Sequence, residues 1–237
     1  MSKRVLVIGD LHCPVEHPGY LKFCKQLYKE HACNTTVLIG DVVDWHAISY
    51  HDKEPECPGA IDEYIAAKAK VKKWHRAFPG AYVCLGNHDI RPQRKAKSAG
   101  VPDRFLKSYS DLWGTPTWTW DFNYMIDDVY YCHGTGKGGI HPAWNKSTKL
   151  GMSVVMGHCH ARAGVKWHVN PIRRWFGMDV GCGIDNDAFQ FVYGRNIDDK
   201  PIISAGVVCA GMPQHFIMPM ARGEKYHKSR FSERTNR

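Results

Sequence analysis

Residues 36–44 read TVLIGDVVD, a short apolar run that ends abruptly in a glycine and a carboxylate. Runs of this length, rich in β-branched residues and bounded by glycine, are typical of buried strands in an α/β sheet. Ligands in such sheets bind beyond the carboxyl ends of the strands. We therefore expect Asp41 and Asp44, which follow the run, to lie at a functional edge of the sheet.

Four more apolar runs end in the same way, and helix-length segments separate the runs. They cover residues 4–9, 81–86, 129–132 and 152–157. The polar residues that follow them are Asp10, His12, Asn87, His88, Asp89, His133, His158 and His160. One Gly-Asp pair after a strand is usually a turn, and one histidine usually makes an ordinary hydrogen bond. Five such ends together, with oxygen and nitrogen donors and no thiolate, predict a site for divalent first-row metals.

The motifs follow one another in a fixed order. They are D-x-H at residues 10–12, G-D-x-x-D at 40–44, G-N-H-D at 86–89, the lone His133, and G-H-x-H at 157–160. This series resembles the signature of the calcineurin-like metallophosphoesterases, and the resemblance spans Val5 to His160. It implies a two-sheet β-sandwich flanked by helices, the four-layer version of an α/β fold. Composition and periodicity alone indicate only α/β.

The resemblance also implies two metal sites that share one carboxylate. One metal would be held by Asp10, His12, Asp41 and His160. The other would be held by Asp41, Asn87, His133 and His158. Two cations roughly 3.5–4 Å apart repel each other, so a shared Asp41 and a shared hydroxide would neutralise the gap. That bridging hydroxide is the expected nucleophile, because coordination lowers the pKa of water. We expect Mn²⁺, with Fe, Zn or Ni as alternatives.

Three residues near the ligands receive other roles from the resemblance. His88 matches the family's histidine that binds no metal, and it would donate a proton to the leaving oxygen or stabilise charge on the phosphoryl group. Asp89 is expected to orient His88, since carboxylates commonly fix a histidine tautomer. Asp44 is expected to orient a metal ligand by contacting its side chain, rather than to bind metal itself.

The charge is strongly positive, with a net charge of +9 and a sequence pI of about 9.1. A basic balance favours phosphate-rich partners such as nucleic acid, although basic residues can also serve solubility alone. Arg91 and Arg94 belong to a basic cluster directly after the G-N-H-D motif and are candidates for substrate binding. Lys137 is a third candidate. It lies in GTGKGG at residues 134–139, which lacks the spacing of a P-loop and is expected to be a loop at the rim.

No linker or change in composition divides the chain, so we expect a single domain over residues 1–221. Residues 222–237 hold six Lys or Arg against two acids and few apolar residues, which predicts a disordered tail.

Apolar spacing predicts helices over 18–30 and 60–78. Strand-like patterns are predicted at 117–120, 165–169, 189–193, 202–208 and 215–218. The aromatic residues Trp45, Tyr50, Trp113, Trp118 and Trp120 could stack on bases, but core packing is the favoured interpretation for most of them.

The cysteine content indicates a cytoplasmic protein. Nine cysteines, with no C-x-x-C pair, argue for reduced thiols rather than a disulfide framework. A cleaved signal peptide is not expected, because the first strand run starts at Arg4 and leads directly to Asp10. No run approaches the roughly 18 apolar residues of a membrane helix. The oligomeric state stays open.

Two departures from the family's protein-phosphatase branch narrow the substrate. That branch has G-D-x-V-D-R-G, whereas Asp44 is followed here by Trp45, so the arginine that would hold a phosphate is missing. The compact GHCH at 157–160 is similar to the phosphodiesterase and nuclease branch. We expect hydrolysis of a phosphodiester in nucleic acid or a nucleotide. The alternatives are a phosphomonoesterase acting on a small molecule or phosphoprotein, and a binding protein on a degenerate scaffold. The filled ligand positions argue against the binding protein.

Overall fold

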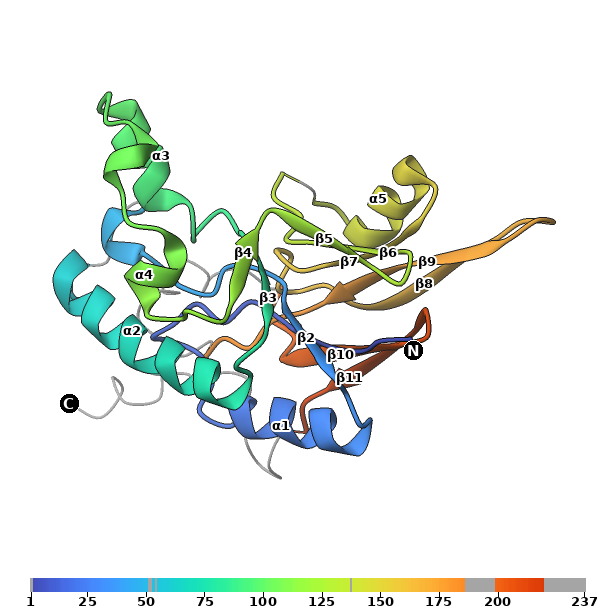
Figure 1. Cartoon of the computed structure of the whole chain (residues 1–237). Coiled ribbons are helices and arrows are strands. Elements are labelled where there is room, and N and C mark those ends of the chain that lie inside the picture. Colours follow the sequence, from blue (N-terminus) through green and yellow to red (C-terminus); the bar gives the residue numbers. More distant parts are fainter. Residues whose placement is uncertain (1, 51–52, 54, 137, 186–198, 220–237) are drawn as a thin grey trace, which may run out of the picture.

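The computed structural model describes residues 2–50, 53, 55–136, 138–185 and 199–219. Within these residues the strands form two mixed sheets that pack face to face, and helices cover the outer side of each sheet (Figure 1). The α/β fold with a two-sheet β-sandwich in four layers is therefore confirmed. The predicted tail at 222–237 and the predicted strand at 189–193 lie outside the described residues.

The first sheet has the strand order β11-β10-β1-β2-β3-β4. Its strands are β1 (Arg4–Ile8), β2 (Thr35–Leu38), β3 (Tyr82–Cys84), β4 (Thr119–Asp121), β10 (Ser204–Cys209) and β11 (Met212–Ile217). The strands β1 to β4 are parallel to their neighbours along this order, whereas β10 pairs antiparallel with both β1 and β11. Parallel pairing directs the carboxyl ends of β1, β2 and β3 toward one edge.

The second sheet has the strand order β5-β6-β7-β9-β8. Its strands are β5 (Asn123–Ile126), β6 (Val129–Cys132), β7 (Ser153–Met156), β8 (Ala163–Val169) and β9 (Arg174–Val180). β6, β7 and β9 are parallel, and β5 and β8 close the sheet as antiparallel edges. β6 and β7 therefore end at a common edge of this sheet.

Alternation along β1 explains why the sheet has a core on both faces. Val5 and Val7 join the core between the sheets, while Leu6 and Ile8 join the core under the helices. A strand that is buried on both faces needs apolar residues at every position, which is why its sequence reads as a continuous run. The second half of β2 alternates in the same way, because Val37 faces the inner core and Leu38 faces the core under the helices.

Five helices accompany the two sheets in the described part of the chain. They are α1 (Tyr20–Glu30), α2 (Ala60–Ala77), α3 (Arg91–Ser98), α4 (Tyr109–Trp113) and α5 (Pro142–Leu150), with short 3₁₀ turns η1 (His46–Ile48) and η2 (Asp103–Phe105). α1 and α2 cover the first sheet, and α5 covers the second. The helices predicted at 18–30 and 60–78 are confirmed as α1 and α2. The strand patterns at 165–169, 202–208 and 215–218 are confirmed as β8, β10 and β11, and 117–120 overlaps β4.

Most of the aromatic residues that could stack on bases belong to the core. Trp45, Trp113 and Trp118 are buried, and Trp120 packs against the same cluster. Tyr50 differs, because 51% of its surface is exposed. All nine cysteines lie among the described residues, and none of them forms a disulfide there. In the part of the chain that the structure describes, no helix is long and apolar enough to cross a membrane.

Candidate metal centre

The loops after β1, β2, β3, β6 and β7 meet at one edge of the sandwich, and hydrogen bonds connect them. The backbone N–H of His12 donates to the carbonyl of Asp41 at 2.8 Å, and the N–H of His158 donates to Asp10 Oδ2 at 2.9 Å. His12, Asp41 and His158 all have positive φ, at 49°, 46° and 73°. Residues other than glycine seldom adopt this conformation, and such strain concentrates at functional sites.

Glycines at the strand ends allow the carboxylates to approach the backbone. A Cβ on Gly86 would collide with the carboxylate of Asp41, and a Cβ on Gly157 would collide with the carboxylate of Asp10. Gly40, at φ 111°, leaves room for the ring of His133, whose Nδ1 would lie only 2.6 Å from an added Cβ. These glycines are therefore required by the packing of the site.

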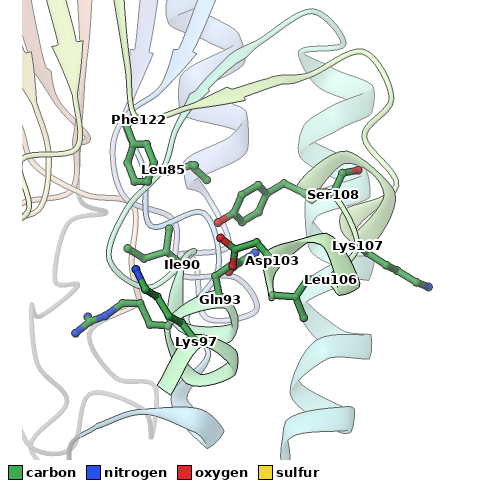
Figure 2. Close-up of a pocket in the computed structure, with 11 residues that line it drawn as sticks. Leu85, Ile90, Gln93, Lys97, Asp103, Leu106, Lys107, Ser108 and Phe122 are labelled. Carbon is green, nitrogen blue, oxygen red and sulfur yellow. The ribbon is translucent and has the colours of Figure 1, made fainter. Parts of the chain in front are cut away.

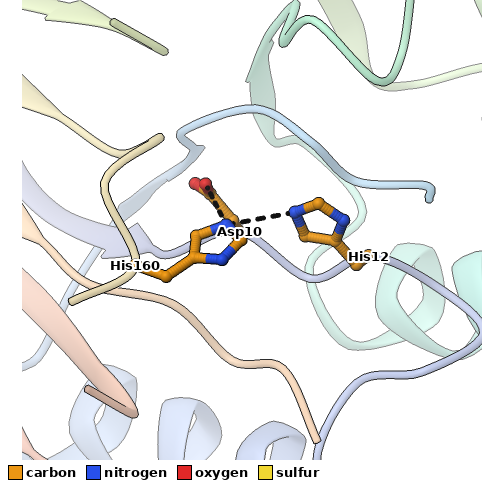
Figure 3. A group of neighbouring side chains, drawn as sticks. All are labelled: Asp10, His12 and His160. Carbon is orange, nitrogen blue, oxygen red and sulfur yellow. Dashed lines mark hydrogen bonds and ion pairs between the residues drawn. The ribbon is translucent and has the colours of Figure 1, made fainter. Parts of the chain in front are cut away.

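One group of donors consists of Asp10, His12 and His160 (Figure 3). His160 Nε2 lies 3.1 Å from Asp10 Oδ2 and 3.2 Å from His12 Nε2. The side chains come from the β1 and β7 loops, and their donor atoms point toward one another. They are three of the four residues expected to hold one metal.

A second group of donors surrounds His133. Its Nε2 lies 3.1 Å from Asn87 Oδ1, 3.2 Å from Asp41 Oδ2 and 3.2 Å from His158 Nδ1. The same Asp41 Oδ2 lies 3.6 Å from His12 Nε2 in the first group. Asp41 therefore stands between the two groups, which is the position that a bridging ligand needs.

The donors in this centre fit divalent cations. Carboxylate, amide and imidazole groups converge without a thiolate, as first-row divalent metals prefer. Asp10 Oδ1 is buried and has no hydrogen-bond partner among the described residues. A polar oxygen buried in this way is costly, and a cation bound beside it would satisfy it.

Electrostatics prepare several of these groups for binding a metal. Burial and the charge of His88 lower the pKa of His12 to about 4, so its imidazole is neutral at neutral pH. Burial opposes ionisation of Asp41, but His133 and His88 hold its pKa well below the usual range. Burial disfavours charge on His133 too, yet Asp41 and Asp10 raise its pKa to about 9. His133 must therefore lose a proton when its Nε2 binds a cation.

His88 lies beside these donors in a network of its own. Its Nδ1 is 2.7 Å from the carbonyl of Asp44 and 3.1 Å from Asp44 Oδ1. Its Nε2 lies 2.9 Å from Arg91 Nη2 and 3.9 Å from Asp41 Oδ2. Burial would lower the pKa of His88, but the carboxylates of Asp41 and Asp44 raise it. His88 is thus adjacent to Asp41 and held by Asp44 and Arg91.

Asp89 does not occupy the place that the sequence suggested. Its carboxylate accepts hydrogen bonds from the backbone N–H groups of Gly86, at 2.9 Å, and Val43, at 3.2 Å. Burial and the charge of Asp41 raise its pKa to about 7. The expectation that Asp89 orients His88 is corrected, because its carboxylate accepts from the backbone of the loops after β2 and β3 instead. Asp44 contacts His88 instead, and its Oδ1 also lies 2.7 Å from Nδ1 of His12, an expected metal ligand.

The three candidate substrate-binding residues lie in different environments. Arg91 is buried and donates to the carbonyls of Asp44, at 2.7 Å, and Trp45, at 3.1 Å, so it braces the site from within. Arg94 is exposed, with its guanidinium 4.9 Å from the centre of the Tyr50 ring. Lys137 lies outside the described residues. The contact between Arg91 and His88 was missed, although their i, i+3 spacing could have suggested it.

Comparison with models of known protein families gives a match over most of the chain. The model of one family, described as calcineurin-like phosphoesterase, matches residues 3–198, which is most of the chain. Among solved structures, vacuolar protein sorting 29 from Cryptosporidium parvum is 13% identical with a TM-score of 0.45, and the match covers 91% of this chain and 96% of that one. YfcE, a phosphoesterase from Escherichia coli, is 11% identical with a TM-score of 0.41 over 86% of this chain and 87% of that one. The nuclease MPE of Pseudomonas putida is 14% identical with a TM-score of 0.34 over 90% and 87%. A search of curated proteins gave no match.

Proposed function

Since the chain belongs to the calcineurin-like phosphoesterase family, we propose that it hydrolyses a phosphodiester in nucleic acid or a nucleotide, with two divalent cations. The observation that carries this proposal is the position of Asp41. Its Oδ2 lies between His133 Nε2, at 3.2 Å, and His12 Nε2, at 3.6 Å, so one oxygen can serve both groups of donors.

We assign the two groups to the ligand sets that the sequence suggested. Asp10, His12, Asp41 and His160 would hold one cation, and Asp41, Asn87, His133 and His158 would hold the other. When bound, the cations would polarise the phosphoryl oxygens and lower the pKa of a water between them. Mn²⁺ is our first choice, with Fe, Zn or Ni as alternatives, because oxygen and nitrogen donors suit all of them.

The protein's own groups would handle the leaving oxygen. Asp44 accepts a hydrogen bond from His88 Nδ1, which directs Nε2 toward Asp41 and the guanidinium of Arg91. An anionic phosphoryl oxygen would attract the guanidinium of Arg91 and free His88 Nε2 to carry a proton. His88 would then protonate the leaving oxygen, and Arg91 would stabilise the phosphoryl charge.

The preference for a diester rests on the sequence departures and on charge. Trp45 replaces the arginine found in the protein-phosphatase branch, and the net charge of +9 favours a polyanionic substrate. A cytoplasmic location belongs to the same proposal, because nine cysteines that form no disulfide among the described residues suit a reducing compartment.

The test is a paired assay in added Mn²⁺ with 4-nitrophenyl phosphate, a monoester, and bis(4-nitrophenyl) phosphate, a diester. We expect faster turnover of the diester, and loss of turnover with a chelator. Faster turnover of the monoester would favour a phosphomonoesterase instead. No turnover of either ester, in a protein that binds no metal, would contradict the enzyme and leave a binding protein on this scaffold.

A further inference from the structure

A second feature adjoins the metal centre without sharing its ligands. It is a cavity of about 490 Å³ beside α3 (Figure 2), within the range of roughly 300–1,000 Å³ that is common for small-molecule sites. Its apolar wall is formed by Leu85, Ile90, Leu106 and Phe122, together with the ring of Tyr109. Phe122 is 58% exposed, so part of its ring is open to a ligand in the cavity.

Part of the polar lining of the cavity comes from one face of α3. Gln93, Arg94 and Lys97 lie three, four and seven residues after Ile90, so all four side chains point to the same side. The amide oxygen of Gln93 is buried and has no hydrogen-bond partner among the described residues. An acceptor buried without a donor is expensive, and a ligand with an N–H group would satisfy it.

The cavity is close to the proposed reaction. Leu85 and Ile90 flank the loop of residues 86–89, and the N–H of Ile90 donates to the carbonyl of Gly86 at 3.3 Å. Arg91, the next residue of the chain, contacts His88. The cavity is therefore lined by the residues on either side of the loop that carries Asn87 and His88.

The lining indicates the chemistry of the occupant. Arg94, Lys97 and Lys107 bring positive charge to the rim against the single carboxylate of Asp103, which favours a ligand that carries phosphate. The apolar and aromatic walls favour a flat apolar ring. The buried Gln93 oxygen favours a ring with a hydrogen-bond donor at its edge. An acyl chain has no such donor.

We propose that this cavity receives the nucleoside part of the phosphodiester, with the base against Phe122 and an N–H of the base donating to the Gln93 amide oxygen. The inference rests on the proposed function, because it assigns one substituent of that substrate. Gln93 and Phe122 are then specificity residues, and the metal ligands act on the phosphate alone.

The test compares diesters that share one leaving group. Thymidine 5′-(4-nitrophenyl phosphate) carries a base with an N–H donor, methyl 4-nitrophenyl phosphate carries no ring, and octyl 4-nitrophenyl phosphate carries an apolar chain. We expect kcat/KM for the thymidine ester to exceed that for the methyl ester by about tenfold or more. Gln93→Leu, which keeps the side-chain volume, and Phe122→Ala should each reduce this ratio about tenfold. Gln26→Leu makes the same chemical change on the exposed side of α1 and should leave the ratio unchanged.

A binding measurement separates this inference from the proposed function. Thymidine 5′-monophosphate should bind the metal-free protein in calorimetry, and Gln93→Leu should weaken its Kd about tenfold. Equal turnover of the thymidine and methyl esters, unchanged in the variants, would overturn the cavity assignment while the phosphodiesterase stands. A preference for the octyl ester would overturn it in favour of an acyl ligand. Binding that weakens in Gln93→Leu, in a protein that turns over no ester, would support the cavity and contradict the phosphodiesterase.

Discussion

Among single residues, Asp44 links the parts of the site. Its Oδ1 lies 2.7 Å from His12 Nδ1 and 3.1 Å from His88 Nδ1, so one buried carboxylate holds an expected metal ligand and the expected proton donor. Burial opposes the ionised form of Asp44, but these two histidines hold its pKa below the usual range. The carboxylate therefore stays charged at neutral pH and fixes the tautomer of both rings.

His88 lies beside the metal ligands without belonging to either set. His88→Asn should retain the metal but lose about 10²–10⁴ in kcat, the usual scale for a positioned acid or base. The loss should be smaller for an ester of 4-nitrophenol than for an ester of an aliphatic alcohol, because an acidic leaving group needs little protonation. Steady-state rates for both esters, with metal content measured in parallel, test this. Equal losses for the two esters would leave only a role in stabilising the phosphoryl group.

Two carboxylates compete for the role of orienting His88, and matched variants distinguish them. Asp44→Asn should lower metal affinity or kcat by about 10–100-fold, the usual cost of losing a group that supports a ligand. Asp89→Asn should instead lower stability by roughly 1–3 kcal/mol, because an amide cannot accept from both Gly86 and Val43. Thermal unfolding and kcat are measured for both variants. A larger loss of kcat in Asp89→Asn, at unchanged Tm, would restore the role that the sequence suggested for Asp89.

Among the elements, the strand ends explain what the sequence could predict. Apolar runs that end in glycine and a polar residue were sufficient to find β1, β2, β3, β6 and β7 and to bring their tips together. The apolar runs do not predict how these strands divide between two sheets, because strand pairing depends on residues far apart in the sequence. Only the family resemblance predicted two sheets. α3 was missed because just one of its residues, Arg91, is buried, which leaves no apolar stripe to detect. The carboxylate that contacts His88 is Asp44 rather than Asp89. Asp44 lies in the loop after β2, next to Trp45, which has φ 54°.

The two ends of β3 offer a direct test of the close packing at the site. Gly86→Ala should displace the carboxylate of Asp41 and weaken metal binding, because the new methyl group would collide with it. Gly80→Ala, at the other end of the strand, meets nothing within 4 Å and should leave metal binding intact. Metal titration of both variants, followed by calorimetry, provides the comparison. If Gly86→Ala binds metal as tightly as Gly80→Ala does, the position of Asp41 does not depend on the glycine.

For the whole molecule, the net charge of +9 is the feature that the metal centre does not explain. Part of it lies near the site, where Arg94 and Lys95 contact the exposed ring of Tyr50 at 4.9 and 4.0 Å from its centre. Another part lies in residues 222–237, outside the described residues, and its role is inferred from composition alone. A single domain over 1–221 also stays a prediction.

Salt dependence tests whether this charge serves nucleic acid. Removal of residues 222–237 should reduce the slope of log K against log salt for a single-stranded oligonucleotide by up to about 4, because six basic residues are lost. KM for the oligonucleotide should rise, while hydrolysis of bis(4-nitrophenyl) phosphate should change little. Binding is measured across a salt series in the parent and shortened proteins. An unchanged slope with an unchanged KM would assign the tail to solubility.

The most direct measurement is the number of metal ions per chain in the parent protein and in Asp41→Asn, by elemental analysis alongside turnover of a diester. Since Asp41 stands between both groups of donors, we predict two ions per parent chain, and the loss of at least one ion and nearly all turnover in the variant. Circular dichroism should show that the fold of the variant largely survives. An active Asp41→Asn protein that still holds two metal ions would contradict the dinuclear centre.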